Sequence, residues 1–415
     1  MVCFPVSLAQ GRGEFAGMKN YIAALDFGTS KIVTLIVESS TSQKCDVVAT
    51  GIATYDGFLK EGWNNPAKLD EAIRQSIQEA ESQINYKVKN LSVGVPGIFT
   101  EAHPTEARVD LKGTQPEVKA EDVKNVFRQA AADLNELPGV VVHTSPAWFL
   151  VDEGKQTLEP TGLKGRSLRG LISFVTANQF FVDDVNIRLQ NMGYTVTGFY
   201  SSAVAEGMLF LPETDRDHMA VLIDVGYLNT DIIIMHGDAL LWIDSIDMGG
   251  GIMAADLAEQ LDIPLSSAEM IKRKFIYGLP SANEDVFSVP AYEAGKTVSV
   301  PREKVVEILE GDVAELAEMI NQAIASSGAR LGNWSNIYLT GGGICMNKGG
   351  KETLSSKMEK PVREAPRKTP KLNSHIFSSS LGLVNLIVNT NQQAQMKNPS
   401  QRGRIREFIE SLKHG

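Results

Sequence analysis

The sequence predicts an α/β protein with two lobes, each built on an open β-sheet. A strand–turn–strand–strand pattern occurs twice, first from Tyr21 and again from Met219. In both copies the first strand ends in Asp-x-Gly, and alternating apolar residues continue on either side of this turn. A single turn of this kind is also typical of an ordinary hairpin, because Asp and Gly are common turn residues. Its repetition favours a duplicated fold.

Length and composition fit a large globular protein. The chain has 415 residues, of which 43% are hydrophobic and 22% charged, enough for two to four structural units. The net charge of −10 argues against sequence-independent binding to nucleic acid, which depends on Lys and Arg. The three cysteines (Cys3, Cys45 and Cys345) have no paired spacing, so we expect neither disulfides nor a zinc site, as in a reducing cytoplasm.

The ends of the chain carry no sign of a membrane span or signal peptide. The apolar runs fall well short of the roughly 20 residues that cross a bilayer. Residues 1–17 lack a basic start, so we expect a disordered extension, and Met18 is a candidate initiation site.

The first lobe is predicted to comprise residues 18–99 and 177–212. Asn65 and Pro66 are placed to start a helix after three strands. Residues 100–176 read as an inserted module of short strands and one helix, Ala120–Leu134. The regular αβ pattern then resumes with helices near Asp183–Met192 and Ser202–Leu211.

The second lobe is predicted to span residues 213–388, with a tip subdomain at about 262–335. It contains helices at Gly250–Leu261 and Ser266–Phe275, and a further helix starting near Met346. Residues 389–403 are polar and predict a flexible linker, which leads to a short helix at 404–415.

The two Asp-x-Gly turns suit an oxyanion. Their backbone N–H groups and hydroxyls would surround a phosphate, and two facing turns would hold one polyphosphate between them. Asp26 and Asp224 are candidates to hold the waters of a Mg²⁺ ion, and Asp224 is the candidate catalytic group. We call residues 26–31 the first clasp and residues 224–231 the second clasp. The predicted nucleotide-binding residues in them are Asp26, Gly28, Thr29, Ser30, Lys31, Gly226, Asn229, Thr230 and Asp231.

Two further elements fit a nucleotide base and ribose. Gly341, Gly342 and Gly343 lie between a strand and a helix, where glycine permits a close approach to the backbone. The alternative is a plain tight turn. Glu269 and Lys272 share one face of a helix and are candidates to bind the ribose and base, although a solvated ion pair is the simpler interpretation. No GxGxxG follows a strand, and Gly295-Lys296-Thr297 lacks the upstream glycine of a P-loop.

The order of these motifs resembles the actin and heat-shock chaperone ATPase superfamily. Within it, stretches such as MGGGIMAADLAEQL and SSAEMIKRKFIYG are similar to the FtsA family of cell-division proteins. The resemblance implies an actin-like two-lobed fold, with duplicated ribonuclease-H-like subdomains and an inserted small α+β domain in the first lobe. It also implies ATP and Mg²⁺ as cofactors and assembly into filaments. The expected location is the cytoplasmic face of the membrane at the division septum. The tip of the second lobe would bind the tubulin-like FtsZ, with other division proteins as further partners.

Several residues depart from that family's pattern. Tyr227, Leu228 and Asn229 replace two glycines and a threonine of the second clasp, so we expect a different turn and weaker phosphate binding. Gly198 stands where a glutamate that orients water is expected, and Ala254 replaces a threonine. Because positioning and charge dominate phosphoryl transfer, slow or absent ATP hydrolysis is predicted rather than a turnover enzyme.

The terminal helix carries one apolar stripe. Ile405, Phe408, Ile409 and Leu412 fall at helical spacing, opposite a charged face. We expect this stripe to bind the membrane surface, weakly as one copy and strongly as many copies on a filament. The alternative is a helix that docks on its own core.

Two other functions of the same superfamily stay open. One is a sugar or acyl-group kinase, which needs a catalytic carboxylate in a substrate cleft, and none is convincing near Gly198. The other is a pilus-assembly scaffold. The terminal amphipathic helix favours the division scaffold over both.

Overall fold

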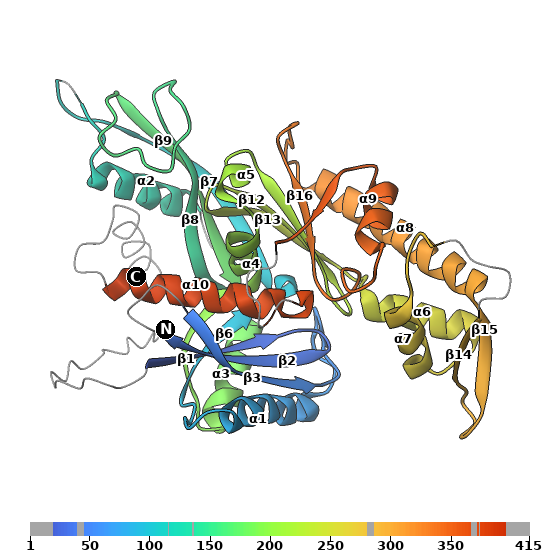
Figure 1. The fold of residues 1–415 in the computed structure, drawn as a ribbon. Coiled ribbons are helices and arrows are strands. Elements are labelled where there is room, and N and C mark those ends of the chain that lie inside the picture. Colours follow the sequence, from blue (N-terminus) through green and yellow to red (C-terminus); the bar gives the residue numbers. More distant parts are fainter. Residues whose placement is uncertain are drawn as a thin grey trace.

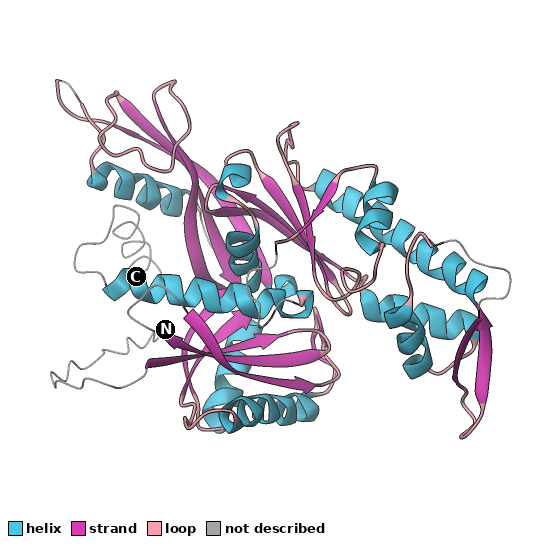
Figure 2. Cartoon of the chain, in the orientation of Figure 1, coloured by secondary structure: helices cyan, strands magenta, loops and turns pink. Residues whose placement is uncertain are grey.

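The computed structural model describes residues 20–39, 45–114, 116–134, 137–279, 286–366, 372 and 374–395. Two five-stranded sheets dominate these residues (Figures 1 and 2). The first contains β1 (Asn20–Phe27), β2 (Lys31–Ser39), β3 (Cys45–Thr54), β6 (Asn90–Val95) and β10 (Thr195–Ser201). The second contains β11 (Ala220–Val225), β12 (Thr230–His236), β13 (Ala239–Ile246), β16 (Ile337–Thr340) and β17 (Val362–Glu364).

The two sheets have the same topology. Their strand orders are β3-β2-β1-β6-β10 and β13-β12-β11-β16-β17. In each sheet the first three strands in sequence pair antiparallel, and the last two join as parallel neighbours. The duplication predicted from the repeated turn is therefore confirmed, and it places the two clasps at equivalent positions.

Helices cover both faces of the first sheet. One face packs on α1 (Pro66–Ser82) and α3 (Gln179–Asn191), and the other packs on α10 (Ser378–Gln395). The Asn65 side chain accepts a hydrogen bond from the Lys68 amide at 3.3 Å, as expected for the predicted cap. Helix α3 begins four residues earlier than predicted because Asn178 caps it. The short elements here are β4 (Phe58–Leu59), β5 (Gly62–Trp63) and the 3₁₀ turn η1 (Gly97–Phe99).

Helix α1 also covers the outer edge of the first sheet, at β3. The Glu79 carboxylate accepts a hydrogen bond from the Ile52 amide at 2.7 Å. The Gln83 side chain accepts one from the Thr50 amide at 3.1 Å and donates one to the Thr50 carbonyl at 2.6 Å. Side chains thus occupy main-chain groups that a neighbouring strand would otherwise use.

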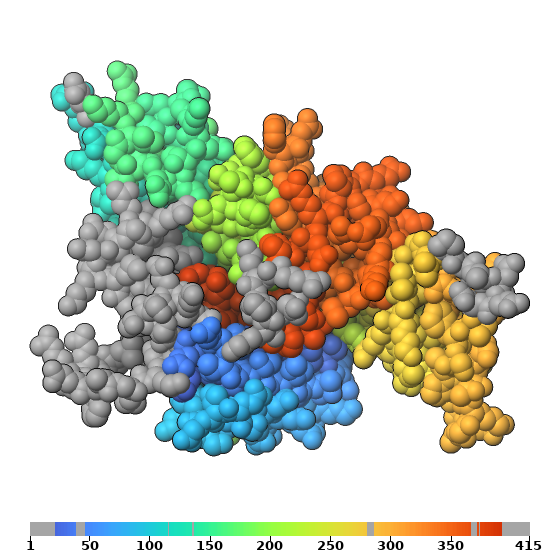
Figure 3. All heavy atoms as spheres, in the orientation of Figure 1, coloured from blue at the N-terminus to red at the C-terminus, as the bar shows by residue number. Residues whose placement is uncertain are grey.

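The second sheet carries a separate core on the face away from the first lobe. This core joins β11 and β12 to α6 (Gly250–Leu261), α7 (Leu265–Lys274), α8 (Arg302–Ser326) and α9 (Gly350–Met358). A two-stranded hairpin, β14 (Val286–Pro290) with β15 (Thr297–Pro301), projects from the far end (Figure 1). In the space-filling view the yellow and amber tip projects at the right and joins the orange part of the second lobe (Figure 3).

The inserted module is a three-stranded sheet covered by one helix. Its order is β7 (Thr100–Asp110), β9 (Ser167–Ala177), β8 (Val140–Val151), and α2 (Ala120–Asp133) packs on it. The module contacts the second sheet at β13, where the Ser173 hydroxyl donates to the Leu240 carbonyl at 2.5 Å. The module therefore contacts the second lobe, although it is inserted in the sequence of the first.

Two helices connect the lobes. They are α4 (Ser202–Phe210) and α10, which pack on each other, and α10 also packs on β1 and β2. The short α5 (Glu213–Arg216) follows α4, and the 3₁₀ turn η2 (His375–Phe377) precedes α10.

Helix α10 runs further than predicted. Residues 389–395, predicted as linker, are helical. The buried Leu383, Leu386 and Ile387 anchor the preceding turns, and extending a helix costs less than starting one. The predicted terminal helix at 404–415 lies outside the described residues. In the described part of the chain, no helix combines the length and apolar character needed to cross a bilayer.

Candidate nucleotide cleft between the lobes

The two clasps form the same turn. In the first, the Gly28 amide donates to the Lys31 carbonyl at 3.0 Å; in the second, the Gly226 amide donates to the Asn229 carbonyl at 2.9 Å. In both turns, four residues lie between the last two paired residues of the flanking strands. The second turn therefore has the geometry of the first, and its expected difference from the family's glycine-rich turn stays a prediction. Tyr227, Leu228 and Asn229 all keep negative φ, so the turn does not need the glycines of the family pattern.

The clasps touch each other directly. The Leu228 amide donates a hydrogen bond to the Thr29 hydroxyl at 3.0 Å, across 199 residues of sequence. The Thr230 hydroxyl instead points into its own lobe and donates to the Met248 carbonyl at 2.6 Å. One predicted phosphate ligand thus bonds the opposite clasp, and another faces away from it.

Asp26 lies on the face of β1 that meets α10. Ala24 packs in the same cluster as α10, and the two-residue period of a strand puts Asp26 on that face. Its Oδ1 accepts hydrogen bonds from the hydroxyls of Ser379 at 2.8 Å and Ser202 at 3.5 Å, and its Oδ2 accepts one from Ser380 at 2.8 Å. Burial raises the pKa of Asp26, while these hydroxyls and the charge of Lys31 oppose the rise.

Lys31 is the cation whose charge acts on both aspartates. Its Nζ donates to the Ile376 carbonyl at 3.0 Å and lies 5.5 Å from the centre of the Phe377 ring. Burial lowers the pKa of Lys31, and the charges of Asp26 and Asp224 oppose that shift. The ammonium group therefore sits between the lobes with a protein carbonyl as its partner.

Asp224 has a different environment from Asp26, because its neighbours are acids. Burial first, and then the charge of Asp231, raise the pKa of Asp224 to about 7, and hydrogen bonding to Glu206 opposes the rise. The pKa of Glu206 is raised well above its usual value, first by burial and then by the charges of Asp224 and Asp231. This shift favours the neutral carboxyl group, which can donate to Asp224. Asp231 has a pKa raised to about 6 by burial, and its Oδ1 accepts a bond from Asn229 Nδ2 at 3.1 Å and one from the Ser245 hydroxyl.

Glu206 was missed by the sequence reasoning. This buried carboxyl group beside Asp224 comes from α4, one turn into a helix whose other residues are mostly apolar. Gly198 itself lies in β10, opposite Ser92. A single charged residue in a buried, apolar helix was the available signal for this residue.

Tyr227 lies among the residues predicted to bind the ribose and base. A Cβ on Gly251 would come within 2.5 Å of the Tyr227 ring, so the ring covers the start of α6. Burial and the neighbouring Glu269 carboxylate raise the pKa of the Tyr227 phenol. The structure thus brings Tyr227, Glu269 and Lys272 together, and Lys272 Nζ donates to the Gly343 carbonyl at 2.7 Å.

The triple glycine packs tightly against the second clasp. Gly341 has φ of +93°, and a Cβ there would lie 2.2 Å from the Asp224 carboxylate. The Gly343 amide donates to the Val225 carbonyl at 2.7 Å. The helix predicted to begin near Met346 begins at Gly350 instead, because the Asn347 side chain ties the intervening loop to α7 through the carbonyls of Lys272 and Phe275.

In this arrangement the cleft does not fit a Mg²⁺–polyphosphate between the clasps. The Thr29–Leu228 contact closes the space where phosphates would lie. Lys31 and Lys272 both donate to protein carbonyls, and the acids around Asp224 have raised pKa values. A bound nucleotide would have to separate these contacts before its phosphates met the predicted donors.

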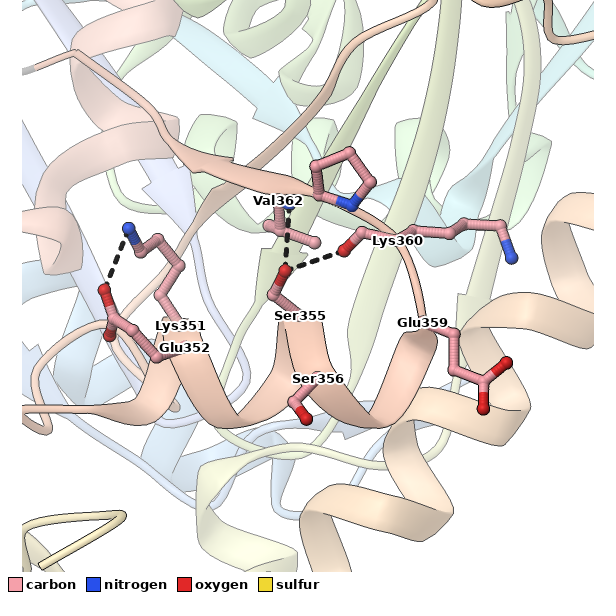
Figure 4. A pocket seen from close by; sticks show the side chains of 8 residues that line it. Lys351, Glu352, Ser355, Ser356, Glu359, Lys360 and Val362 are labelled. Atoms are coloured by element: carbon pink, nitrogen blue, oxygen red, sulfur yellow. Dashed lines mark hydrogen bonds and ion pairs between the residues drawn. The ribbon is translucent and has the colours of Figure 1, made fainter.

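Two surface hollows lie elsewhere. One, of about 390 Å³, lies between α9 and β17, where Ser355 donates to the Lys360 carbonyl at 2.7 Å and accepts from the Val362 amide (Figure 4). The other, of about 750 Å³, lies on the inserted module beside α2 and is lined by side chains of both charges. Neither includes a clasp residue.

Comparison with known proteins finds similarity to one family over most of the chain. The model of the family described as "Cell division protein FtsA" matches residues 221–382. The FtsA of Neisseria meningitidis serogroup B is 26% identical over 382 residues, covering 88% of this chain and 90% of that protein. The chain is a homologue of the bacterial cell-division protein FtsA. The match covers both lobes and the inserted module, well beyond the clasps alone.

Solved structures confirm that this FtsA homologue has the actin-like fold. A PilM–PilN type IV pilus biogenesis complex matches with a TM-score of 0.59 and 16% identity, covering 88% of this chain and 98% of that one. MreB5 of Spiroplasma citri, solved with AMPPNP, matches with a TM-score of 0.53 and 10% identity, covering 92% and 100%. At these identities the likeness shows the fold alone.

Proposed function

We propose that this FtsA homologue is a membrane-attached scaffold for an FtsZ-like protein at the division septum, with weak or absent ATP hydrolysis. Two observations together support the proposal. The chain is similar to FtsA, and the polar groups of its interlobe cleft bond one another. Such a protein would act by binding and polymerising rather than by turnover.

The tip subdomain is the proposed site for the FtsZ-like partner. Large apolar side chains are exposed there, and exposed apolar patches mark interaction surfaces. Tyr292 on the β14–β15 hairpin is 70% exposed, and Val286 is 58% exposed. The other exposed members are Leu265, Met270 and Leu279. A short apolar tail that folds on binding suits a patch of this kind.

The proposed membrane contact rests on the sequence of residues 404–415. The four residues of its apolar stripe each gain about 1.5–3 kcal/mol on burial, but ordering the helix offsets much of that. Single copies should therefore bind weakly, and a filament should bind strongly by multivalency.

Co-sedimentation with liposomes containing anionic lipids tests this function. The full chain should pellet with liposomes and should recruit purified FtsZ to them. Phe408→Glu with Ile409→Glu should abolish both, whereas Glu410→Gln on the charged face should change neither. Equal pelleting of the double variant would contradict the membrane role, and liposome binding without FtsZ recruitment would contradict the scaffold role.

Steady-state phosphate release tests the second half of the proposal. Purified protein with Mg²⁺ and ATP should release phosphate at a rate close to that of buffer alone. A rate well above background would show that the cleft opens and catalyses hydrolysis.

A pilus-assembly scaffold is the second candidate, since the PilM–PilN complex shares the fold over 98% of its own chain. Binding of a PilN-type peptide in preference to an FtsZ tail peptide would favour that function.

A further inference from the structure

One short segment contacts both lobes at once. It comprises residues 375–380, which form the 3₁₀ turn η2 and the first residues of α10, and we call it the α10 latch. We propose that the α10 latch holds the lobes closed without a nucleotide, so that closure of this FtsA homologue is set by the chain itself. Closure here means direct contact of the clasps through Thr29 and Leu228.

The latch binds the first lobe through the two charged residues of the first clasp. Ser379 and Ser380 donate to different oxygens of Asp26, both at 2.8 Å. The Ile376 carbonyl accepts from Lys31 Nζ at 3.0 Å. Hydrogen bonds to charged groups are stronger than those between neutral groups, and Asp26 is only 6% exposed. The latch therefore occupies the polar groups that a nucleotide and its metal would otherwise attract.

The latch binds the second lobe through a chain of hydrogen-bonded side chains, buried at Thr340, His375 and Ser378 and exposed at Glu364. The two ring nitrogens of His375 contact the Thr340 hydroxyl at 3.1 Å and the Glu364 carboxylate at 2.8 Å. The Ser378 hydroxyl bonds that of Thr340 at 2.5 Å. Thr340 ends β16 and Glu364 ends β17, so the latch is attached to the edge of the second sheet.

The latch also closes the space above the triple glycine. A Cβ on Gly342 would lie 2.9 Å from the Ile376 side chain, so Ile376 packs directly on this glycine. In Figure 1 the start of α10 lies between the first sheet and the second lobe, where it meets both. One short segment thus links Asp26 and Lys31 to Thr340 and Glu364.

Hydrogen exchange of the full-length protein tests the latch. The Leu228 amide reports on closure because it donates to Thr29. Without nucleotide, peptides covering Leu228 should be strongly protected, and Mg²⁺–ATP should slow their exchange by less than about twofold. Ser379→Ala with Ser380→Ala should speed that exchange by about tenfold or more, since two bonds to a buried carboxylate are lost.

A second variant removes the contact between the latch and the second lobe. Thr340→Val keeps the side-chain shape but removes the hydroxyl that meets His375 and Ser378, and it should also speed Leu228 exchange. Ser355→Ala is the matched control, because it also removes a hydroxyl, one that bonds Lys360 and Val362 at the α9–β17 hollow. Circular dichroism should show all variants folded.

Two results would overturn the latch. One is a wild-type Leu228 amide that exchanges freely until Mg²⁺–ATP protects it tenfold or more. The other is unchanged exchange in both latch variants while they remain folded. Neither result depends on liposome or FtsZ binding, so failure of the latch is distinguishable from failure of the proposed function.

Discussion

The buried aspartates of the two clasps occupy equivalent strand ends but have opposite surroundings. Three serine hydroxyls from α4 and α10 donate to Asp26. Asp224 instead faces two other acids, Asp231 and Glu206, and burial raises the pKa of both. The backbone turn is the same in both. Duplication has therefore kept the main-chain geometry, while neighbouring side chains decide the electrostatics of each copy. Those around Asp26 come from α4 and α10, and those around Asp224 come from β12 and α4.

The largest effect should come from the glycines around the second clasp. Gly341→Ala combines positive φ with a Cβ at 2.2 Å from the Asp224 carboxylate, and should lower the free energy of unfolding by about 3–5 kcal/mol. Gly28→Ala meets the Lys31 carbonyl at 3.1 Å without positive φ, and should cost about 1 kcal/mol. Urea unfolding measures both. Similar losses would show that the two clasps are packed equally tightly.

An intermediate effect should follow from changes at Glu206. Glu206→Ala leaves Asp224 without that donor and should destabilise the fold by about 2 kcal/mol. Glu206→Gln keeps a donor of nearly the same shape, and should change stability by less than about 1 kcal/mol. Thermal unfolding near pH 7 separates the two. If Gln proves as damaging as Ala, Glu206 does not act as a donor.

Restoring glycine at positions 227 and 228 should have the smallest effect on stability. It is also the most direct test of how the two clasps differ. Tyr227→Gly with Leu228→Gly removes the ring from the start of α6, and should raise Mg²⁺–ATP affinity by about tenfold. Tyr292→Ala, at the distant tip, is the control and should leave affinity unchanged. Isothermal titration measures this. An unchanged affinity would show that another feature, for instance the α10 latch, limits the binding of Mg²⁺–ATP.

Local signals predicted the local structure well. The Asn65 cap and the apolar spacing of α1 gave that helix its observed start, and the repeated Asp-x-Gly turns predicted the duplicated sheets. The non-glycine residues of the second turn did not indicate that its backbone matches the first clasp, because side-chain type alone does not fix φ.

The partners of the clasps could not be predicted because they are distant in sequence. Ser379 and Ser380 meet Asp26 across more than 350 residues, and no periodicity in α10 marks these hydroxyls as ligands of a buried acid. The direct Thr29–Leu228 contact likewise depends on how the lobes close. Only the folded structure shows which clasp residues already have hydrogen-bond partners within the protein.

The side chains of Glu79 and Gln83 along β3 matter for a protein proposed to assemble with copies of itself. An open strand edge would let two subunits join by backbone pairing in any register, and such pairing leads to disordered aggregates. With Ile52 and Thr50 already bonded to α1, that route is blocked at this edge. Subunits would then have to recognise one another by side chains, which permits a single, repeatable geometry.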